Sequence, residues 1–174
     1  MAEKATAKGM SAVVLFSTRY GTTEKVARAF ETGLSGAGMK TVCLNTHEVA
    51  PESLKQYDLI CLAGPTEVFG ATKTIKEFLR AAAGTDLEGK FGFAFDTKLD
   101  SHMSGSASKY IEHVLDDQGV HMVAHRESAI VTSKKEGGKI VGAELKAGEE
   151  ERFVQLGVRV GTQAAEAKAL ISPS

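Results

Sequence analysis

Short apolar runs alternate along the chain with longer stretches whose apolar residues have helical spacing. Residues 12–16 (AVVLF) and 59–63 (LICLA) are apolar at every position, as strands buried on both faces require. Three further runs are predicted as strands, at residues 40–44, 90–95 and 121–131, the last in one or two pieces. This alternation predicts βαβ units and a parallel sheet covered on both faces.

Helices are predicted between these strands, where apolar positions fall on one stripe. They are residues 23–35, 73–83, 106–117 and 149–168. Three glutamates open the last of them, at the positive end of the helix dipole. Residues 49–54 (VAPESL) are short and contain a proline, so a single turn is expected there. Residues 134–148 fit either a small hairpin turning at Gly137 and Gly138 or a surface loop.

The length of 174 residues fits one domain with one core. We expect a single domain at residues 11–169, a mobile N-terminal tail at residues 1–10 and a frayed C-terminal tail at residues 170–174. Among the possible winding orders, 2-1-3-4-5 places strands one and three side by side at a switch point of the sheet. Ligands of such sheets bind outside the carboxyl ends of the strands. The loops there are residues 17–23, 64–72 and 96–105.

Charge and hydropathy argue against a nucleic-acid-binding, membrane or secreted protein. The formal net charge is -1 and no basic stripe is visible, so nucleic-acid binding is not expected. No run approaches the roughly 20 apolar residues that cross a bilayer. Residues 1–9 lack the apolar stretch of a signal peptide. We therefore expect a soluble, cytoplasmic protein without membrane insertion.

Cysteine and histidine usage argues against thiol and metal chemistry. Cys43 and Cys61 each lie in an apolar run without C-x-x-C spacing, so they are interpreted as reduced core thiols. The histidines form no H-x-x-x-H pair on a predicted helix, so no metal site is predicted.

The polar run after the first strand, residues 17–24 (STRYGTTE), leads into a helix. Its hydroxyls and the unsatisfied N–H groups of a helix N-terminus favour a phosphate, and Gly21 lets the backbone approach it closely. The G-x-G-x-x-G and Gly-Lys-Ser/Thr patterns are both missing, which disfavours nicotinamide dinucleotides and ATP as tightly held cofactors. Alternatively, Thr22 or Thr23 caps the helix, which accounts for one of the hydroxyls.

Residues 18–23 (TRYGTT) resemble the phosphate loop of flavodoxins, roughly Ser/Thr-x-Thr-Gly-x-Thr. Thr18, Gly21 and Thr23 match, Thr22 fills the free position, and Tyr20 replaces a usual threonine. The resemblance runs from about residue 12 to the last helix. It implies a doubly wound α/β domain whose five-stranded parallel sheet has the order 2-1-3-4-5, with helices on both faces, and flavin mononucleotide (FMN) as cofactor. The phosphate residues that it implies are Thr18, Arg19, Tyr20, Gly21, Thr22 and Thr23.

The same resemblance implies that two further loops hold the flavin ring. Thr66, Phe69 and Gly70 would line one side, with the Gly70 peptide free to turn toward flavin N5. Phe69 is equally compatible with an ordinary hydrophobic anchor. The residues on the other side would be Asp96, Thr97, Leu99 and His102. Flavodoxins commonly stack a tyrosine on the ring from this third loop, whereas here its only ring is the imidazole of His102.

The expected function is electron transfer through FMN to redox partner proteins or a small electron acceptor. Electron-carrier flavodoxins are usually strongly acidic, unlike this chain. A two-electron reductase of the quinone or protoporphyrinogen type therefore remains open. A flavodoxin-fold binding or regulatory domain without flavin is the alternative from another class.

Overall fold

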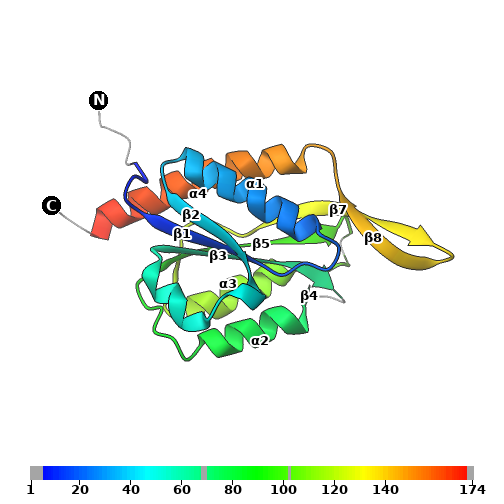
Figure 1. Cartoon of the computed structure of the whole chain (residues 1–174), viewed down its shortest axis with the longest axis horizontal. Coiled ribbons are helices and arrows are strands. Elements are labelled where there is room, and N and C mark those ends of the chain that lie inside the picture. The colour runs from blue at the N-terminus through cyan, green and yellow to red at the C-terminus, as the bar shows by residue number, and fades with distance from the viewer. Residues whose placement is uncertain (1–5, 68–69, 102, 172–174) are drawn as a thin grey trace.

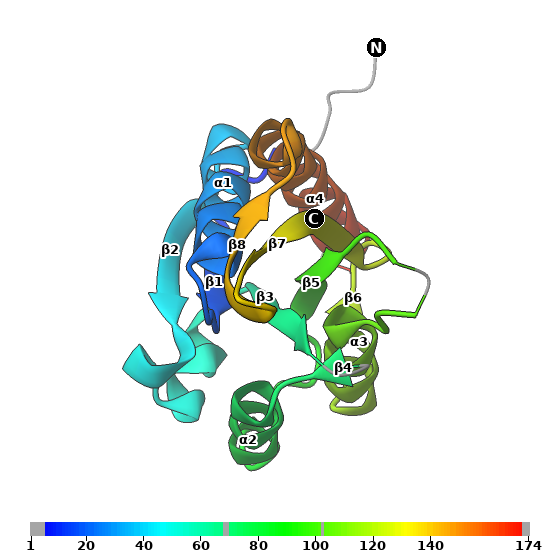
Figure 2. The ribbon, with the colours of Figure 1, turned by 90° about the vertical axis from the view of Figure 1, so that its right-hand side faces the viewer.

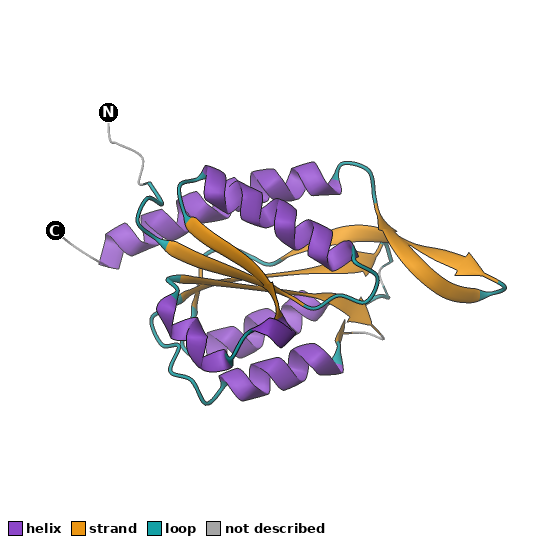
Figure 3. Cartoon of the chain, in the orientation of Figure 1, coloured by secondary structure: helices purple, strands orange, loops and turns teal. Residues whose placement is uncertain are grey.

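The computed structural model describes residues 6–67, 70–101 and 103–171. Its strands are β1 (Ser11–Phe16), β2 (Lys40–Asn45), β3 (Leu59–Glu67), β4 (Gly70–Ala71), β5 (Phe91–Leu99), β6 (His121–Met122), β7 (Glu127–Glu136) and β8 (Lys139–Leu145). They form one twisted sheet of order β2-β1-β3-β5-β7-β8, with β4 paired to β3 and β6 to β5 (Figure 1). Helices pack on both faces of this sheet (Figure 3).

The principal strands are parallel. β1 pairs with β2 and β3, β3 pairs with β5, and β5 pairs with β7. With β4 and β6 set aside as short side strands, these five have the order 2-1-3-4-5, so the predicted doubly wound α/β fold is confirmed. The sheet is nevertheless wider than predicted, because β8 adds an antiparallel edge next to β7.

Val14 at the centre of β1 lies between Cys43 of β2 and Cys61 of β3. Two strand spacings separate the cysteine Cα atoms by roughly 10 Å, beyond the reach of about 7 Å that a disulfide allows. Both are free thiols. Burial raises the pKa of the Cys43 thiol to about 12 and that of Cys61 well above its usual value, so neither provides a reactive thiolate.

The helices of the described chain are α1 (Thr22–Gly36), α2 (Lys73–Ala82), α3 (Ala107–Asp117) and α4 (Glu149–Ile171), with two 3-10 helices, η1 (Thr46–Glu48) and η2 (Pro51–Gln56). α1 and α4 cover one face of the sheet, and the other helices cover the opposite face. Figure 2 shows these two layers along the strand direction. Among the described helices, none combines the length and apolar character that crossing a membrane requires.

Side-chain alternation along the strands divides the core into two layers. Val14 packs in the layer of α1 and α4, whereas its neighbour Val13 packs in the layer of α2 and α3. Three phenylalanines centre the first layer: the ring of Phe95 lies 4.9 Å from that of Phe30 and 5.5 Å from that of Phe153, measured between centroids. This contact fixes α1 and α4 against β5.

The α1 and α4 backbones meet at two glycines. A Cβ atom on Gly33 would collide with the carbonyl oxygen of Val154, and one on Gly157 would collide with that of Phe30. The helices approach this closely only because neither position carries a side chain. The position of α1, and hence of its N-terminus, depends on this contact.

The predicted end of the fourth strand is wrong. We expected the strand to stop at residue 95 and a polar loop to begin at Asp96, but β5 continues to Leu99. Thr97 lies between Pro65 of β3 and Ala129 of β7. Because neighbours on both sides satisfy its backbone groups, the polar sequence stays extended.

Of the two interpretations of residues 134–148, the hairpin is confirmed: β7 and β8 turn at Gly137 and Gly138 with φ values of 56° and 78°. Two other boundaries differ from the prediction. η2 extends over six residues where a single turn was expected. Ala7 and Met10 are buried against the core, so packing begins before residue 11.

Candidate functional site

A cavity of about 500 Å³ opens at the carboxyl ends of the parallel strands. It lies between the loop after β1, the ends of β3 and β5, and the β7–β8 hairpin. The structure brings six of the residues chosen from the sequence to its walls: Arg19, Tyr20, Thr22, Thr66, Thr97 and Leu99. These six come from all three loops at the predicted switch point.

The loop after β1 presents an uncapped helix N-terminus. Gly21 precedes α1 with a φ of 87°, and a Cβ atom built there would meet nothing within 4 Å. The Gly21 N–H donates a hydrogen bond of 2.9 Å to Thr18 Oγ1, so this N–H already has a partner within the loop. No side chain of the described residues caps α1, whereas Thr72 caps α2 and Ser106 caps α3. The capping interpretation of Thr22 and Thr23 is therefore wrong.

Thr22 and Thr23 have different environments. Thr22 is largely buried and lines the cavity. The fully buried Thr23 shares a hydrogen bond of 2.8 Å between its Oγ1 and Thr97 Oγ1 on β5. The Thr23 hydroxyl therefore faces a protein partner, which leaves Thr22 as the first-turn hydroxyl open to a ligand.

Thr66 and Asp96 hold the N-terminus of α3. Thr66 Oγ1 accepts from the Ala107 N–H at 3.0 Å. Asp96 Oδ2 accepts from the Ser106 hydroxyl and the Ser108 N–H, both at 2.8 Å. Asp96 is fully buried and points to the sheet face opposite Thr97, so its carboxylate does not line the cavity. Its Oδ1 has no hydrogen-bond partner among the described atoms.

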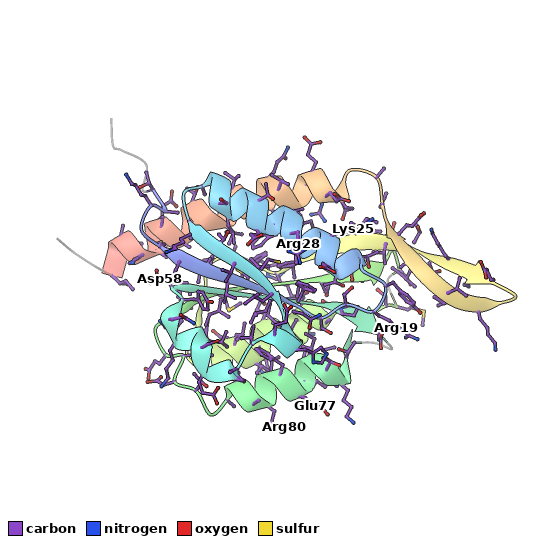
Figure 4. The ribbon with its side chains drawn as sticks, viewed as in Figure 1. Arg19, Lys25, Arg28, Asp58, Glu77 and Arg80 are labelled. Atoms are coloured by element: carbon purple, nitrogen blue, oxygen red, sulfur yellow. The ribbon has the colours of Figure 1, made fainter. Side chains whose placement is uncertain are left out.

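Arg19 joins the first loop to the second. Its Nη1 lies 3.4 Å from Glu67 Oε1, and its guanidinium lies 5.1 Å from the centroid of the Tyr20 ring. The ion pair is exposed and adds little stability. A second cavity, of about 360 Å³, shares Arg19 and Glu67 with the first and is also lined by Thr18. Figure 4 shows Arg19 at the end of the molecule from which the hairpin projects.

The remaining ring-contact candidates are Gly70, Phe69 and His102. Gly70 belongs to β4, where it pairs with Glu67, and is not part of the cavity lining. Phe69 and His102 lie outside the described residues, so their predicted ring contacts stay predictions. Within the described ranges, no cluster of three or more His, Cys, Asp or Glu side chains could hold a metal ion.

Sequence reasoning missed the hairpin as part of this site. Its lining residues are Val131, Ser133, Lys139, Ile140, Gly142 and Ala143. Pro65, Glu67 and Lys98 were missed as well, although they lie within the loops that were singled out. The Gly137-Gly138 step indicated a hairpin, but nothing in the sequence indicated that it would fold over the cavity.

The family model for flavodoxin matches residues 14–155, which is most of the chain. The chain belongs to the flavodoxin family. This confirms the resemblance drawn from the phosphate loop. Proteins of this family bind flavin, typically FMN, and transfer electrons to redox partners.

A curated relative of similar sequence is also a flavodoxin. A flavodoxin from Clostridium saccharobutylicum is 29% identical over 89 residues. That match covers 51% of this chain and 56% of the relative, so the chain spans little more than half of the curated relative's length.

Solved structures support the fold. A flavodoxin from the domain Archaea superimposes with a TM-score of 0.72 at 18% identity, over 89% of this chain and 99% of that one. Oxidised Flavodoxin 1 from Bacillus cereus gives 0.71 at 20% identity, over 86% and 96%. The rubredoxin oxygen:oxidoreductase of Desulfovibrio gigas gives 0.71 at 17% identity, over 91% of this chain but 36% of that protein. At these identities, the likeness concerns the fold alone.

The residues of this flavodoxin-family chain fit an FMN molecule. At one end, the N-terminus of α1 follows a glycine with open space beside it, as an anionic phosphate requires. At the other end, the cavity has the volume of a small-molecule site and is lined partly by Tyr20, Leu99 and Ile140. The charged phosphate of FMN matches the first end, and its flat isoalloxazine ring matches the second.

Proposed function

We propose that this chain holds one FMN non-covalently and transfers electrons through it. One observation carries the proposal: the uncapped N-terminus of α1 lies at the edge of the cavity that opens at the carboxyl ends of β3 and β5. This site lies at the switch point of the sheet, where doubly wound folds bind their ligands.

The phosphate end uses the loop from Thr18 to Thr23. The first-turn N–H groups of α1 and the Thr22 hydroxyl are the principal donors, and Arg19 adds positive charge. Gly21 gives the backbone its left-handed conformation. Thr23 acts indirectly, because its hydroxyl holds Thr97. Tyr20 lies where the loop meets the cavity.

The ring end lies between the second and third loops. Thr66, Thr97 and Leu99 all line the cavity, and the Thr97 hydroxyl is hydrogen-bonded to Thr23 of α1. Asp96 contributes through its backbone, since its carboxylate holds α3. When bound, FMN supplies reversible electron uptake, and the protein sets its orientation and potential.

A two-electron reductase is the second candidate, favoured by the charge of the cavity. Its lining includes Arg19, Lys98 and Lys139 against the single acid Glu67. Positive charges near a flavin lower the energy of its anionic reduced form and so favour uptake of the second electron. A reductive titration distinguishes the candidates: a carrier takes up its two electrons at well-separated potentials, whereas a reductase takes them up nearly together.

A charge introduced at Thr22 tests the phosphate end. Thr22→Asp places a carboxylate beside the expected phosphate and should weaken FMN binding at least tenfold, by like-charge repulsion. Riboflavin, which has no phosphate, should bind the variant and the wild type alike. Both affinities are measured by quenching of flavin fluorescence.

Thr32→Asp is the matched control, since Thr32 is an exposed threonine of the same helix. It lies ten residues further along, about 15 Å from Thr22. That distance exceeds the Debye length of about 8 Å at physiological salt. FMN affinity should be unchanged. Equal losses in the two variants, or weaker riboflavin binding to Thr22→Asp, would contradict the phosphate assignment.

A further inference from the structure

The β7–β8 hairpin lies outside the three loops that were expected to hold the flavin, yet it closes one side of the cavity. We propose that this hairpin is the second wall of the flavin-ring site, with Ile140 in the place of the aromatic side chain that the third loop lacks. The inference rests on the proposed function and assigns new binding residues to it.

Strand register turns one face of the hairpin toward the cavity. Ser133 lies opposite Ala143, and both line the cavity. Residues one position along point to the other face. There, Lys134 Nζ forms an ion pair of 2.7 Å with Glu144 Oε1. The row that faces the cavity therefore includes the small side chains of Ser133 and Ala143, and the Lys134–Glu144 ion pair lies on the outer face.

A β-bulge determines which residue near the tip of the hairpin faces the cavity. The register shifts between Lys134 and Lys135, so that Lys135 pairs with Ile140 and Val141 is skipped. Side chains two positions apart share a face, which places Ile140 in the same row as Ser133 and Ala143. Without the bulge, Val141 would occupy that row. The hairpin thus points its largest apolar side chain near the tip at the cavity.

Three large apolar side chains from separate elements are exposed around this one space. Ile140 is 51% exposed, Leu99 is 41% exposed and Tyr20 is 38% exposed, and all three line the cavity. Apolar surface gathered around a cavity is typical of a binding site for an apolar ligand. A flat ring held in this space would cover apolar surface that the protein leaves exposed.

The base of the hairpin is held by the domain. The Ile130 N–H donates to Glu149 Oε2 at 2.8 Å, and the Lys146 N–H donates to the Ile130 carbonyl at 2.9 Å. Val131, next along β7, is buried. The wall is therefore anchored to α4 and the sheet before any ligand binds, which reduces the entropy cost of binding.

Two adjacent substitutions test this wall. Ile140→Ala removes apolar contact with the ring, so it should raise the dissociation constants of FMN and riboflavin by the same factor, roughly five- to tenfold. Val141→Ala is the matched control: Val141 is 48% exposed but does not line the cavity. Its affinities should stay within about twofold of wild type. Fluorescence quenching gives the constants, and thermal unfolding confirms that both variants fold.

A shortened hairpin gives a second, larger change. Replacing residues 134–142 by Asn-Gly joins Ser133 to Ala143, which are direct cross-strand partners, through a two-residue turn. Riboflavin affinity should fall at least as far as in Ile140→Ala. If wild type binds flavin and neither Ile140→Ala nor the shortened chain weakens it beyond Val141→Ala, the hairpin wall is refuted and the proposed function stands. If wild type binds no flavin, the proposed function itself fails.

Discussion

Thr23 and Thr97 are 74 positions apart in the chain, yet their hydroxyl oxygens lie 2.8 Å apart in the protein interior. Thr23 belongs to the first turn of α1, and Thr97 belongs to the end of β5. Their hydrogen bond therefore links the phosphate end of the proposed FMN site to its ring end. The sequence predicted both residues as ligand contacts, and the structure shows that their hydroxyls contact each other.

Breaking this pair should reduce stability. Thr97→Val leaves the buried Thr23 hydroxyl without its partner, which should lower the free energy of unfolding by about 1–3 kcal/mol. The double variant Thr23→Val/Thr97→Val removes both polar groups and should recover part of that loss. Urea unfolding of the wild type, both single variants and the double variant measures the coupling. Strictly additive losses would show that the hydrogen bond contributes nothing.

The close contact between α1 and α4 predicts a second stability difference. Gly157→Ala forces a methyl group against the carbonyl oxygen of Phe30, so the helices must separate. We expect a loss of about 1–3 kcal/mol or more. Gly36→Ala, also in α1, is the control: its Cβ would meet only the Val158 side chain, at 3.9 Å. That substitution should be neutral or stabilising by up to about 1 kcal/mol, because alanine favours the helix. Equal effects would contradict the close-packed interface.

Acid should weaken the base of the hairpin through Glu149. Hydrogen bonds from Arg152 and from the Ile130 N–H lower the pKa of this carboxyl below its usual 4.5, despite partial burial. A lowered folded-state pKa means that the charged form stabilises the fold. This contribution is complete above pH 4.5 and is lost as the pH falls through the lower folded-state value.

Glu149→Gln tests this dependence, because it removes the charge while keeping an acceptor oxygen. The variant should be less stable than wild type at pH 7, and the difference should shrink as the pH falls below 4.5. Glu150→Gln is the matched control, since Glu150 is the exposed neighbour on the same helix. It should show a smaller, flatter difference. A constant gap between Glu149→Gln and wild type over this pH range would contradict the assigned role.

The sequence predicted the parallel core of the fold because its signals are local. Runs such as residues 12–16 and 59–63 are apolar at every position, and the helices between strands carry single apolar stripes. The end of β5 could not be predicted in this way. Asp96, Thr97 and Lys98 have the polarity of a loop, and only their pairing with β3 and β7 keeps them extended.

Only the part of the candidate site that follows from local sequence signals was predicted. A hydroxyl-rich turn after a buried strand is a local pattern, so Thr22 and its neighbours were identified. The contribution of Ile140 depends on a one-residue bulge and on the fold of the hairpin over the cavity. Likewise, the role of Asp96 at α3 depends on Ser106 and Ser108, ten or more positions away. Such relationships arise only from tertiary structure.

The visible absorption spectrum of the freshly purified protein, followed by titration of any apo fraction with FMN, shows whether this chain binds the flavin. We expect the two absorption bands of oxidised flavin, or saturable uptake of one FMN per chain with tighter binding than riboflavin. A colourless protein that takes up no FMN at high concentration would contradict this expectation and leave a flavodoxin-fold domain with another ligand.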